Sequence, residues 1–295
     1  MNTNKYTALF IAATVFLFSA CVPKSDRKSD VLTVTIPPQQ FFLDHIVGDT
    51  FTINVLVPSG MNHETYDPAP AAMVALSKST IYFKVGNLGF ENVWVGRLAK
   101  NNPNVTIIDC SAGVQLIDGH ACCAHHDHNH SHDAMDPHVW TSPSAARVIA
   151  KNMLDAVSNL NPENADFYHA NFEKLIEKIN QTDEAIQDLL KDVPSKSFII
   201  YHPALGYFAN EYDLQQLSIE FEGKNPSPAQ MRSLIDTAKK EEIKIIFIQK
   251  GFDEKNAEVI AREVGATVYE INPLAYEWDD ELIRIATILA GKYER

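Results

Sequence analysis

The chain has 295 residues, of which 45% are hydrophobic and 9% are aromatic, and its formal net charge at pH 7 is −13. This composition excludes an intrinsically disordered chain, and the length allows two domains of ordinary size or one large domain. The acidic balance argues against a nucleic-acid-binding protein, because contact with phosphates requires a basic face.

The N-terminus has the composition of a signal peptide over residues 1–20. Lys5 precedes an apolar run over 8–18, which is too short to span a bilayer comfortably, and small residues follow the run. The segment Ser19-Ala20-Cys21 resembles the end of a bacterial lipobox, in which Cys21 is lipidated and becomes the mature N-terminus. A plain secretory signal with an incidental cysteine is the alternative. Both interpretations predict export, and no later stretch is long and apolar enough for a transmembrane helix.

From residue 31 onward, β-rich runs alternate with helical stretches. This alternation predicts an open, largely parallel sheet, and such sheets bind ligands in loops beyond the carboxyl ends of their strands. The predicted strands of the first half are 31–36, 51–57, 81–87 and 105–110, and the predicted helices are 41–49, 71–79 and 91–100.

The pattern becomes helical after Trp140. Ser142-Pro143-Ser144 is a good helix start, and the stretch 163–193 contains no proline or glycine. Apolar residues recur at helical spacing in that stretch. We therefore predict a single helix of roughly 45 Å, long enough to brace two lobes.

The second half repeats the alternation of strands and helices. The predicted fold class is α/β, with two open, largely parallel-sheet lobes that face a cleft and are joined by one long rigid linking helix. The expected domains are a first lobe over 31–141, a helical connection over 142–193 and a second lobe over 194–295. The predicted strands are 197–202, 214–220, 243–249 and 266–272, and the predicted helices are 204–211, 228–241, 255–264 and 280–292.

A histidine-rich loop lies at residues 120–132. A packed core cannot satisfy so many neighbouring imidazoles, because each buried ring needs a partner for both nitrogens. Such a tract is typical of a solvated, metal-collecting loop, and a dispensable spacer is the alternative. Cys110 could form a disulfide with Cys122 or Cys123, or the adjacent pair could bind metal with the histidines. The histidines of the tract are His120, His125, His126, His128, His130 and His132.

Three other histidines, His63, His138 and His202, each follow a predicted strand. Only a fold that brings strand ends from both halves together could unite them, and two α/β sheets facing each other across a cleft would do so. His63 could instead be an exposed loop residue, and His202 could be a satisfied core histidine. His45 and His169 fall inside predicted helices without a second candidate ligand at helical spacing, and we assign them to structure.

Five short motifs occur in order along the chain: Gly60-xx-His63-xx-Tyr66-Asp67-Pro68; Asp136-Pro137-His138-Val139-Trp140; Tyr201-His202-Pro203-Ala204 with Gly206-Tyr207-Phe208; Glu222-Gly223-Lys224-x-Pro226-Ser227-Pro228; and Asn272-Pro273-Leu274. Together they resemble the zinc/manganese class of solute-binding proteins that serve bacterial ABC importers. Each motif alone is weak, but the series covers nearly everything from residue 31 to the C-terminus. The resemblance implies two α/β lobes joined by a rigid helix, in agreement with the prediction for 163–193.

Carried over position by position, the resemblance implies metal ligation by His63, His138 and His202. The fourth position departs from the family, because many relatives have an aspartate where Asn272 stands. Some zinc-binding members take a glutamate from a nearby loop instead, so we predict Glu277 as the fourth ligand. Glu270, Asn272 or a water molecule are rivals, and Glu277 could equally be a solvated carboxylate at a helix start.

Three imidazoles with a carboxylate or a water suit tetrahedral zinc, whereas two histidines with two carboxylates would suit manganese. We therefore expect a monomeric binding protein, not an enzyme, that captures extracytoplasmic Zn²⁺ and delivers it to the membrane subunit of an ABC permease. It would be lipid-anchored at the cell envelope, facing the periplasm or the exterior, and would not bind nucleic acid. The alternatives are a manganese-binding or adhesin member of the same family, or a zinc-dependent hydrolase, although neither HExxH nor GxSxG occurs.

Overall fold

The computed structural model describes residues 31–64, 66–119, 135–220, 224–250, 252 and 255–293. Within these ranges the chain forms two four-stranded parallel sheets with equivalent strand orders, β2-β1-β3-β4 and β6-β5-β7-β8. Each strand lies inside a range predicted from the sequence. The strands are β1 (Val31–Val34), β2 (Thr52–Val55), β3 (Ile81–Lys84), β4 (Thr106–Asp109), β5 (Ser197–Ile200), β6 (Gln215–Ser218), β7 (Ile245–Gln249) and β8 (Thr267–Ile271).

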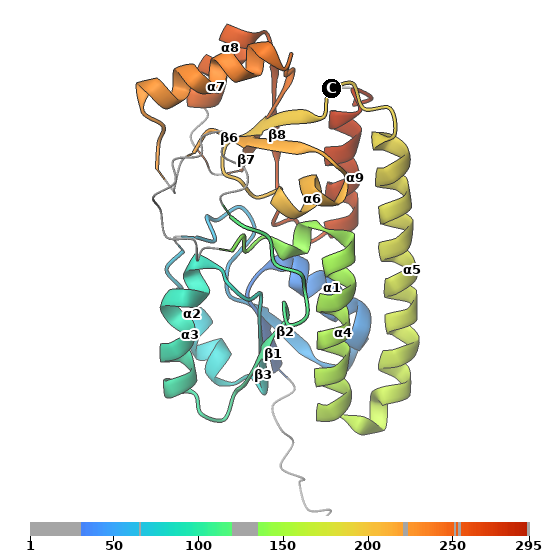
Figure 1. Cartoon of the computed structure of the whole chain (residues 1–295). Helices are drawn as coiled ribbons and strands as arrows, with labels where there is room; N and C mark the ends of the chain where they lie inside the picture. The colour runs from blue at the N-terminus through green and yellow to red at the C-terminus, as the bar shows by residue number, and fades with distance from the viewer. Residues whose placement is uncertain are drawn as a thin grey trace, which may run out of the picture.

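Helices cover both faces of the first sheet, as expected for parallel strands joined by helical crossovers. Prolines occupy the first positions of two of these helices, where the missing N–H is not needed. Figure 1 shows α1 on one side of the sheet and α2 and α3 on the other. The three helices are α1 (Pro37–Val47), α2 (Pro70–Ser77) and α3 (Gly89–Asn101).

Two long helices, α4 (Pro143–Leu160) and α5 (Ala165–Leu190), connect the lobes. The hydroxyl of Ser142 caps α4 by accepting a hydrogen bond from Ala145 N. A 3₁₀ turn over Pro162–Asn164 precedes α5, so this helix begins slightly later than predicted and extends for 26 residues, about 39 Å. It packs against α4, against α1 of the first lobe and against the C-terminal helix α9 (Trp278–Leu289) of the second. The prediction of a long linking helix is confirmed.

The second sheet also has a helical layer on each face. Phe198 and Ile200 of β5 face the large core shared with α5 and α9, whereas Ile199 between them faces a smaller core under α7 and α8. This alternation follows from the two-residue period of a strand, and because both faces are covered the three buried residues of the strand are all apolar. The remaining helices of this lobe are α6 (Gly206–Glu211), α7 (Pro228–Lys240) and α8 (Lys255–Val264).

The large hydrophobic core is continuous between the lobes. Trp140 and Trp278 are both buried in it. The Trp140 indole N–H donates to Pro273 O at 2.8 Å, and the Trp278 indole N–H donates to Trp140 O at 2.6 Å. The Lys178 ammonium contacts the Asp279 carboxylate at 2.5 Å between α5 and α9. The lobes are therefore held by packing as well as by chain connection, which opposes a wide hinge motion.

Several predictions from the N-terminus and the histidine-rich loop lie outside the described residues. These are the signal peptide, Cys21, the histidines between 120 and 132, and Cys122 and Cys123. Cys110 is described: it is fully buried after β4 and forms no disulfide with another described residue. No helix in the described part of the chain has both the length and the apolar character needed to cross a membrane.

Candidate functional site

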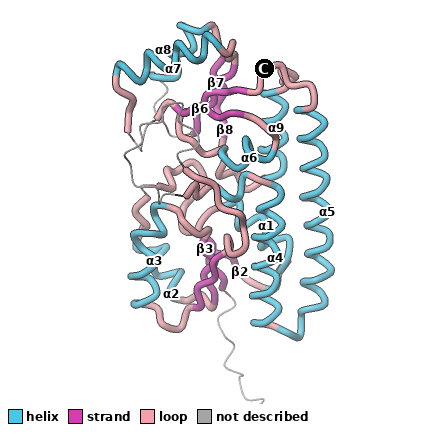
Figure 2. Tube along the Cα trace, in the orientation of Figure 1, coloured by secondary structure: helices cyan, strands magenta, loops and turns pink. Residues whose placement is uncertain are grey.

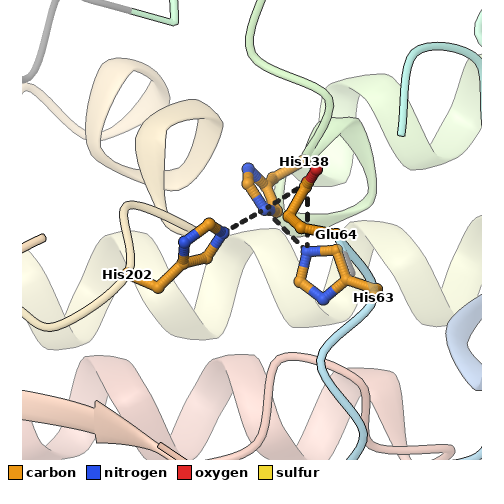
Figure 3. Close-up of side chains that lie close together, drawn as sticks. All are labelled: His63, Glu64, His138 and His202. Atoms are coloured by element: carbon orange, nitrogen blue, oxygen red, sulfur yellow. Dashed lines mark hydrogen bonds and ion pairs between the residues drawn. The ribbon is translucent and has the colours of Figure 1, made fainter. Parts of the chain in front are cut away.

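Loops at the carboxyl ends of the two sheets meet between the lobes, and His63, His138 and His202 come together there (Figures 2 and 3). All three histidines are buried. His138 is central, with its Nε2 atom 2.9 Å from Nε2 of His63 and 3.3 Å from Nε2 of His202. Glu64 completes the group, because its Oε1 atom lies 3.6 Å from His63 Nε2 and 4.0 Å from His138 Nε2. One ligand atom from each of the four residues lies within 4.8 Å of the others.

His63 and Glu64 lie in the loop between β2 and α2. Met61 N donates to Pro58 O at 3.3 Å, and Gly60 between them has a φ of 79°, a conformation that favours glycine. The Asn62 side chain then accepts a hydrogen bond from Glu64 N at 2.9 Å, which bends the chain again. In an extended segment two successive side chains point in opposite directions. This turn instead directs both His63 and Glu64 at the same point.

His138 is fixed by Asp136, two residues earlier. One oxygen of Asp136, Oδ1, lies 2.8 Å from the backbone N–H of His138 and 2.7 Å from its ring Nδ1. Tyr207 of the second lobe donates from its hydroxyl to Asp136 O at 3.1 Å. Gly206 lies against the other oxygen of Asp136, and a side chain there would overlap it. The Asp-Pro-His segment is therefore held by both lobes.

His202 lies two residues after the end of β5 and is fixed by groups of the second lobe. Its ring Nδ1 lies 2.9 Å from Glu220 Oε2, and its backbone N–H donates to Gln249 Oε1 at 3.2 Å. The Gln249 amide also donates to His202 O at 2.5 Å. Phe252 stacks on the ring, with 5.6 Å between centroids and an interplanar angle of 19°.

The hydrogen bonds assign the ring tautomers of two histidines. Asp136 and Glu220 are acceptors, so in the neutral rings of His138 and His202 the proton is on Nδ1, and Nε2 presents a lone pair. Two lone pairs that face each other at 3.3 Å repel unless a cation lies between them. Glu64 Oε1 is buried among them and accepts no hydrogen bond. This donor set is therefore built for a cation.

The electrostatic environment shifts the pKa values of His63 and His138 in opposite directions. Burial, reinforced by the neighbouring His138 and His202, holds the pKa of His63 well below its ordinary 6.5. Burial also opposes protonation of His138, but the charge and hydrogen bond of Asp136, with the charges of Glu64 and Glu220, outweigh it. The pKa of His138 is consequently raised. A proton therefore competes with a metal ion more strongly at His138 than at His63.

The geometry also fits zinc. Zn–N bonds of about 2.0–2.1 Å in a tetrahedron place neighbouring ligand atoms about 3.3 Å apart. The separations from His138 Nε2 to the other imidazoles are 2.9 and 3.3 Å, and the carboxylate of Glu64 lies slightly farther away. The four ligand atoms, all within 4.8 Å of one another, therefore lie close to the spacing that a four-coordinate zinc ion requires.

The structure does not bring Glu277 to this cluster. Glu277 is exposed at the residue preceding α9, as in the alternative of a solvated helix-start carboxylate. Glu270 is also exposed, on β8. Asn272 is used between the lobes, where its amide donates to Ser59 Oγ at 2.9 Å and its Oδ1 accepts from Leu274 N.

Glu64 as a ligand candidate and the supporting roles of Asp136 and Glu220 were not predicted from the sequence. The Asp-Pro-His spacing contained a signal for Asp136, because a carboxylate two residues before a loop histidine can accept from its backbone and its ring. No local signal pointed to Glu64 or Glu220. The two other histidines in the described part of the chain are not members of the cluster: His45 is bonded through Nδ1 to Phe41 O on α1, and His169 is exposed on α5.

Comparison with known proteins identifies relatives over almost the whole chain. The family model described as "ZnuA: Zinc-uptake complex component A periplasmic" matches residues 32–285. The chain is 31% identical to the high-affinity zinc uptake system protein ZnuA of Bacillus subtilis (strain 168), over 92% of this chain and 89% of that protein. It is 27% identical to the zinc-binding lipoprotein AdcA of Streptococcus pneumoniae (strain ATCC BAA-255 / R6), over 92% of this chain but 55% of AdcA.

A solved structure gives the same result for the fold. The crystal structure of a ZnuA superimposes with a TM-score of 0.81 at 34% sequence identity, covering 88% of this chain and 98% of that one. The laminin-binding adhesin Lmb of Streptococcus agalactiae has a TM-score of 0.77 at 23% identity, covering 89% of this chain and 99% of that one, which shows a shared fold.

Proposed function

The chain belongs to the ZnuA family of periplasmic zinc-uptake components, and from this premise we propose that it captures Zn²⁺ through His63, His138, His202 and Glu64. The observation that carries the site assignment is the convergence of three imidazole Nε2 atoms and the unpartnered Glu64 oxygen on one buried point. Captured zinc is delivered to the ABC permease with which the family works. The manganese-binding and adhesin alternatives are not favoured by the family match.

Ligand chemistry supports zinc as the solute. Imidazole nitrogens suit zinc, whereas manganese prefers a site with more oxygen donors, and the cluster offers three nitrogens and one carboxylate. The direct test is competition between Zn²⁺ and Mn²⁺ for the purified protein, followed by a chromophoric chelator. We expect zinc to displace manganese. Preference for manganese would contradict the proposal.

We expect the carboxylate behind His138 to contribute to zinc affinity. Asp136→Ala removes the group that selects the Nδ1–H tautomer and orients the ring. Loss of such a supporting partner lowers metal affinity by roughly 10–100-fold. The measurement is the zinc dissociation constant by chelator competition. Asp118→Ala is the control, because Asp118 is an aspartate outside the cluster, and it should bind zinc as the parent protein does.

We expect zinc affinity to fall as the pH decreases. Zinc requires the deprotonated ring nitrogen, and the raised pKa of His138 means that protons begin to compete above the ordinary histidine range near 6.5. His63, whose pKa is lowered, stays neutral through this range and does not add to the early loss. Chelator competition at successive pH values measures the effect. Affinity that is constant between pH 8 and pH 5, about the range in which histidine titrates, would contradict imidazole ligation.

The family places the chain outside the cytoplasm, and we propose that lipid on Cys21 holds it at the membrane. The lipobox-like sequence and the lipoprotein relative AdcA support this anchor. Cys21→Ala should release the protein from the membrane fraction into the soluble fraction. If Cys21→Ala remains membrane-bound, the anchor lies elsewhere.

The protein acts as a monomer and as a carrier without enzymatic activity in this proposal. Capture and release of an ion need no covalent chemistry, and the solute-binding family supports a transport role.

The histidine-rich loop would collect zinc near the site, because its imidazoles can bind the ion weakly and exchange it fast. Deleting residues 120–132 should then slow zinc loading and leave the tight site intact, as measured by stopped-flow loading and equilibrium competition.

A further inference from the structure

The first residue of α3, Gly89, lies against the Glu64 carboxylate at the edge of the histidine cluster. We propose that Gly89 is a positioning residue that fixes Glu64 as the fourth, oxygen-donating ligand. The inference rests on the proposed zinc capture at this cluster. It concerns how the one carboxylate of the set is held in place.

Gly89 holds one oxygen of Glu64 and leaves the other free. The Gly89 backbone N–H donates to Glu64 Oε2 at 3.0 Å. The other oxygen, Oε1, is buried without a hydrogen-bond partner and lies 3.6 Å from His63 Nε2. Gly89 N belongs to the first turn of a 13-residue helix, where N–H groups lack intrahelical acceptors and favour a negative charge. The carboxylate is thus anchored through Oε2 with Oε1 directed at the histidines.

Close approach, and not backbone conformation, explains the glycine at this position. Gly89 does not have a positive φ, so its backbone is open to other residues. Alanine is also a better helix former than glycine. A Cβ at position 89, however, would overlap Glu64 Oε2 and lie 3.0 Å from the Glu64 carbonyl oxygen. A side chain at position 89 and the observed Glu64 conformation are therefore incompatible.

The turn before Gly89 is itself fixed by a buried carboxylate. Glu91 is 1% exposed and accepts hydrogen bonds from Val85 N at 2.6 Å, from Gly86 N at 2.8 Å and from the Thr35 hydroxyl at 2.5 Å. These bonds tie the end of β3 and the start of α3 to β1. The position of the Gly89 N–H is consequently fixed by these hydrogen bonds. The Glu64 side chain takes the conformation that places Oε2 against this N–H.

The test compares Gly89→Ala with Gly96→Ala in the full chain. Gly96 lies in the same helix, and a Cβ there would meet nothing within 4 Å. We expect Gly89→Ala to weaken zinc binding at least tenfold, on the scale seen when groups that orient metal ligands are removed. Gly96→Ala should bind zinc as the parent protein does. Thermal melting of the zinc-free proteins checks that both variants fold.

A double-mutant cycle with Glu64→Ala shows whether Gly89 acts through Glu64. Removing the Glu64 side chain relieves most of the overlap, so adding Gly89→Ala to Glu64→Ala should lower affinity no further. Visible absorption of bound Co²⁺ reports the ligand set independently, and the Gly89→Ala spectrum should resemble that of Glu64→Ala.

Three results would overturn the inference. They are parent-like zinc affinity in Gly89→Ala, an equal loss from Gly89→Ala with and without the Glu64 side chain, or parent-like affinity in Glu64→Ala. His138→Ala separates these failures from failure of the proposed function. If His138→Ala loses tight zinc binding in any of these cases, zinc capture by the histidines stands and only the positioning role is lost.

Discussion

His138→Ala is expected to abolish tight zinc binding while leaving the protein folded. The Nε2 atom of His138 lies 2.9 Å from that of His63 and 3.3 Å from that of His202, so the substitution removes the ligand that lies next to both other imidazoles. The reduction in affinity should exceed the roughly 10–100-fold loss caused by removing a supporting partner. It is measured by chelator competition and by the zinc content of the purified protein.

His169→Ala is the matched control for this experiment. His169 is exposed on α5 and is not a member of the cluster. The His169→Ala substitution removes one imidazole and leaves the cluster unchanged, so zinc affinity and melting temperature should match those of the parent protein. If His138→Ala still bound zinc tightly and deletion of residues 120–132 abolished tight binding, the principal zinc site would not be the histidine cluster.

Trp140→Ala is expected to lower the free energy of unfolding more than any of the substitutions at the zinc site. Trp140 is 1% exposed and is among the largest buried side chains in the described part of the chain. Replacing a buried tryptophan by alanine removes its packing and leaves a cavity, at a cost of about 3–5 kcal/mol. Pro273 O also loses its indole donor. The free energy of unfolding, measured by urea denaturation monitored by circular dichroism, should fall by this amount.

Trp140→Ala should also weaken zinc binding. The Trp140 ring lies 5.7 Å from the His63 ring, edge to face, and supports its orientation. Because zinc binds only the folded state, saturating zinc should recover part of the lost stability. Trp94→Ala is the control. Trp94 is half-buried on α3, and Arg97 lies 5.6 Å above its ring. If Trp94→Ala lowered the free energy of unfolding as much as Trp140→Ala, the contact of Trp140 between the lobes would not explain its effect on stability.

Local sequence patterns predicted most of the fold. Strands such as 197–202 are apolar on both faces because helices cover both faces of a parallel sheet, and this pattern can be read without neighbours. The linking helix could be predicted from helical spacing and from the absence of proline and glycine in 163–193. Its start could not be placed, because Pro162 begins a 3₁₀ turn that precedes the α-helix.

The fourth member of the cluster shows what local sequence does not contain. Glu277 was chosen for its proximity to a motif, yet it is exposed beside α9. Glu64 was passed over although it adjoins a predicted ligand. Its direction depends on the turn made by Asn62 and on the position of Gly89, which is distant in the sequence.

By itself the sequence determined the α/β class, the two-lobed plan and the three histidines that follow strands, because strand and helix periods and the order of strand ends are local properties. The spacing of Asp136 and His138 contained a local signal for one orienting group, but the tertiary structure alone decided which carboxylate joins the histidines and which groups orient the His202 ring. Those choices are made by contacts such as Asp136 with Tyr207 and Glu64 with Gly89, between residues far apart along the chain. Where side-chain direction is fixed by packing and hydrogen bonds between elements distant in the sequence, neighbouring residues do not contain that information.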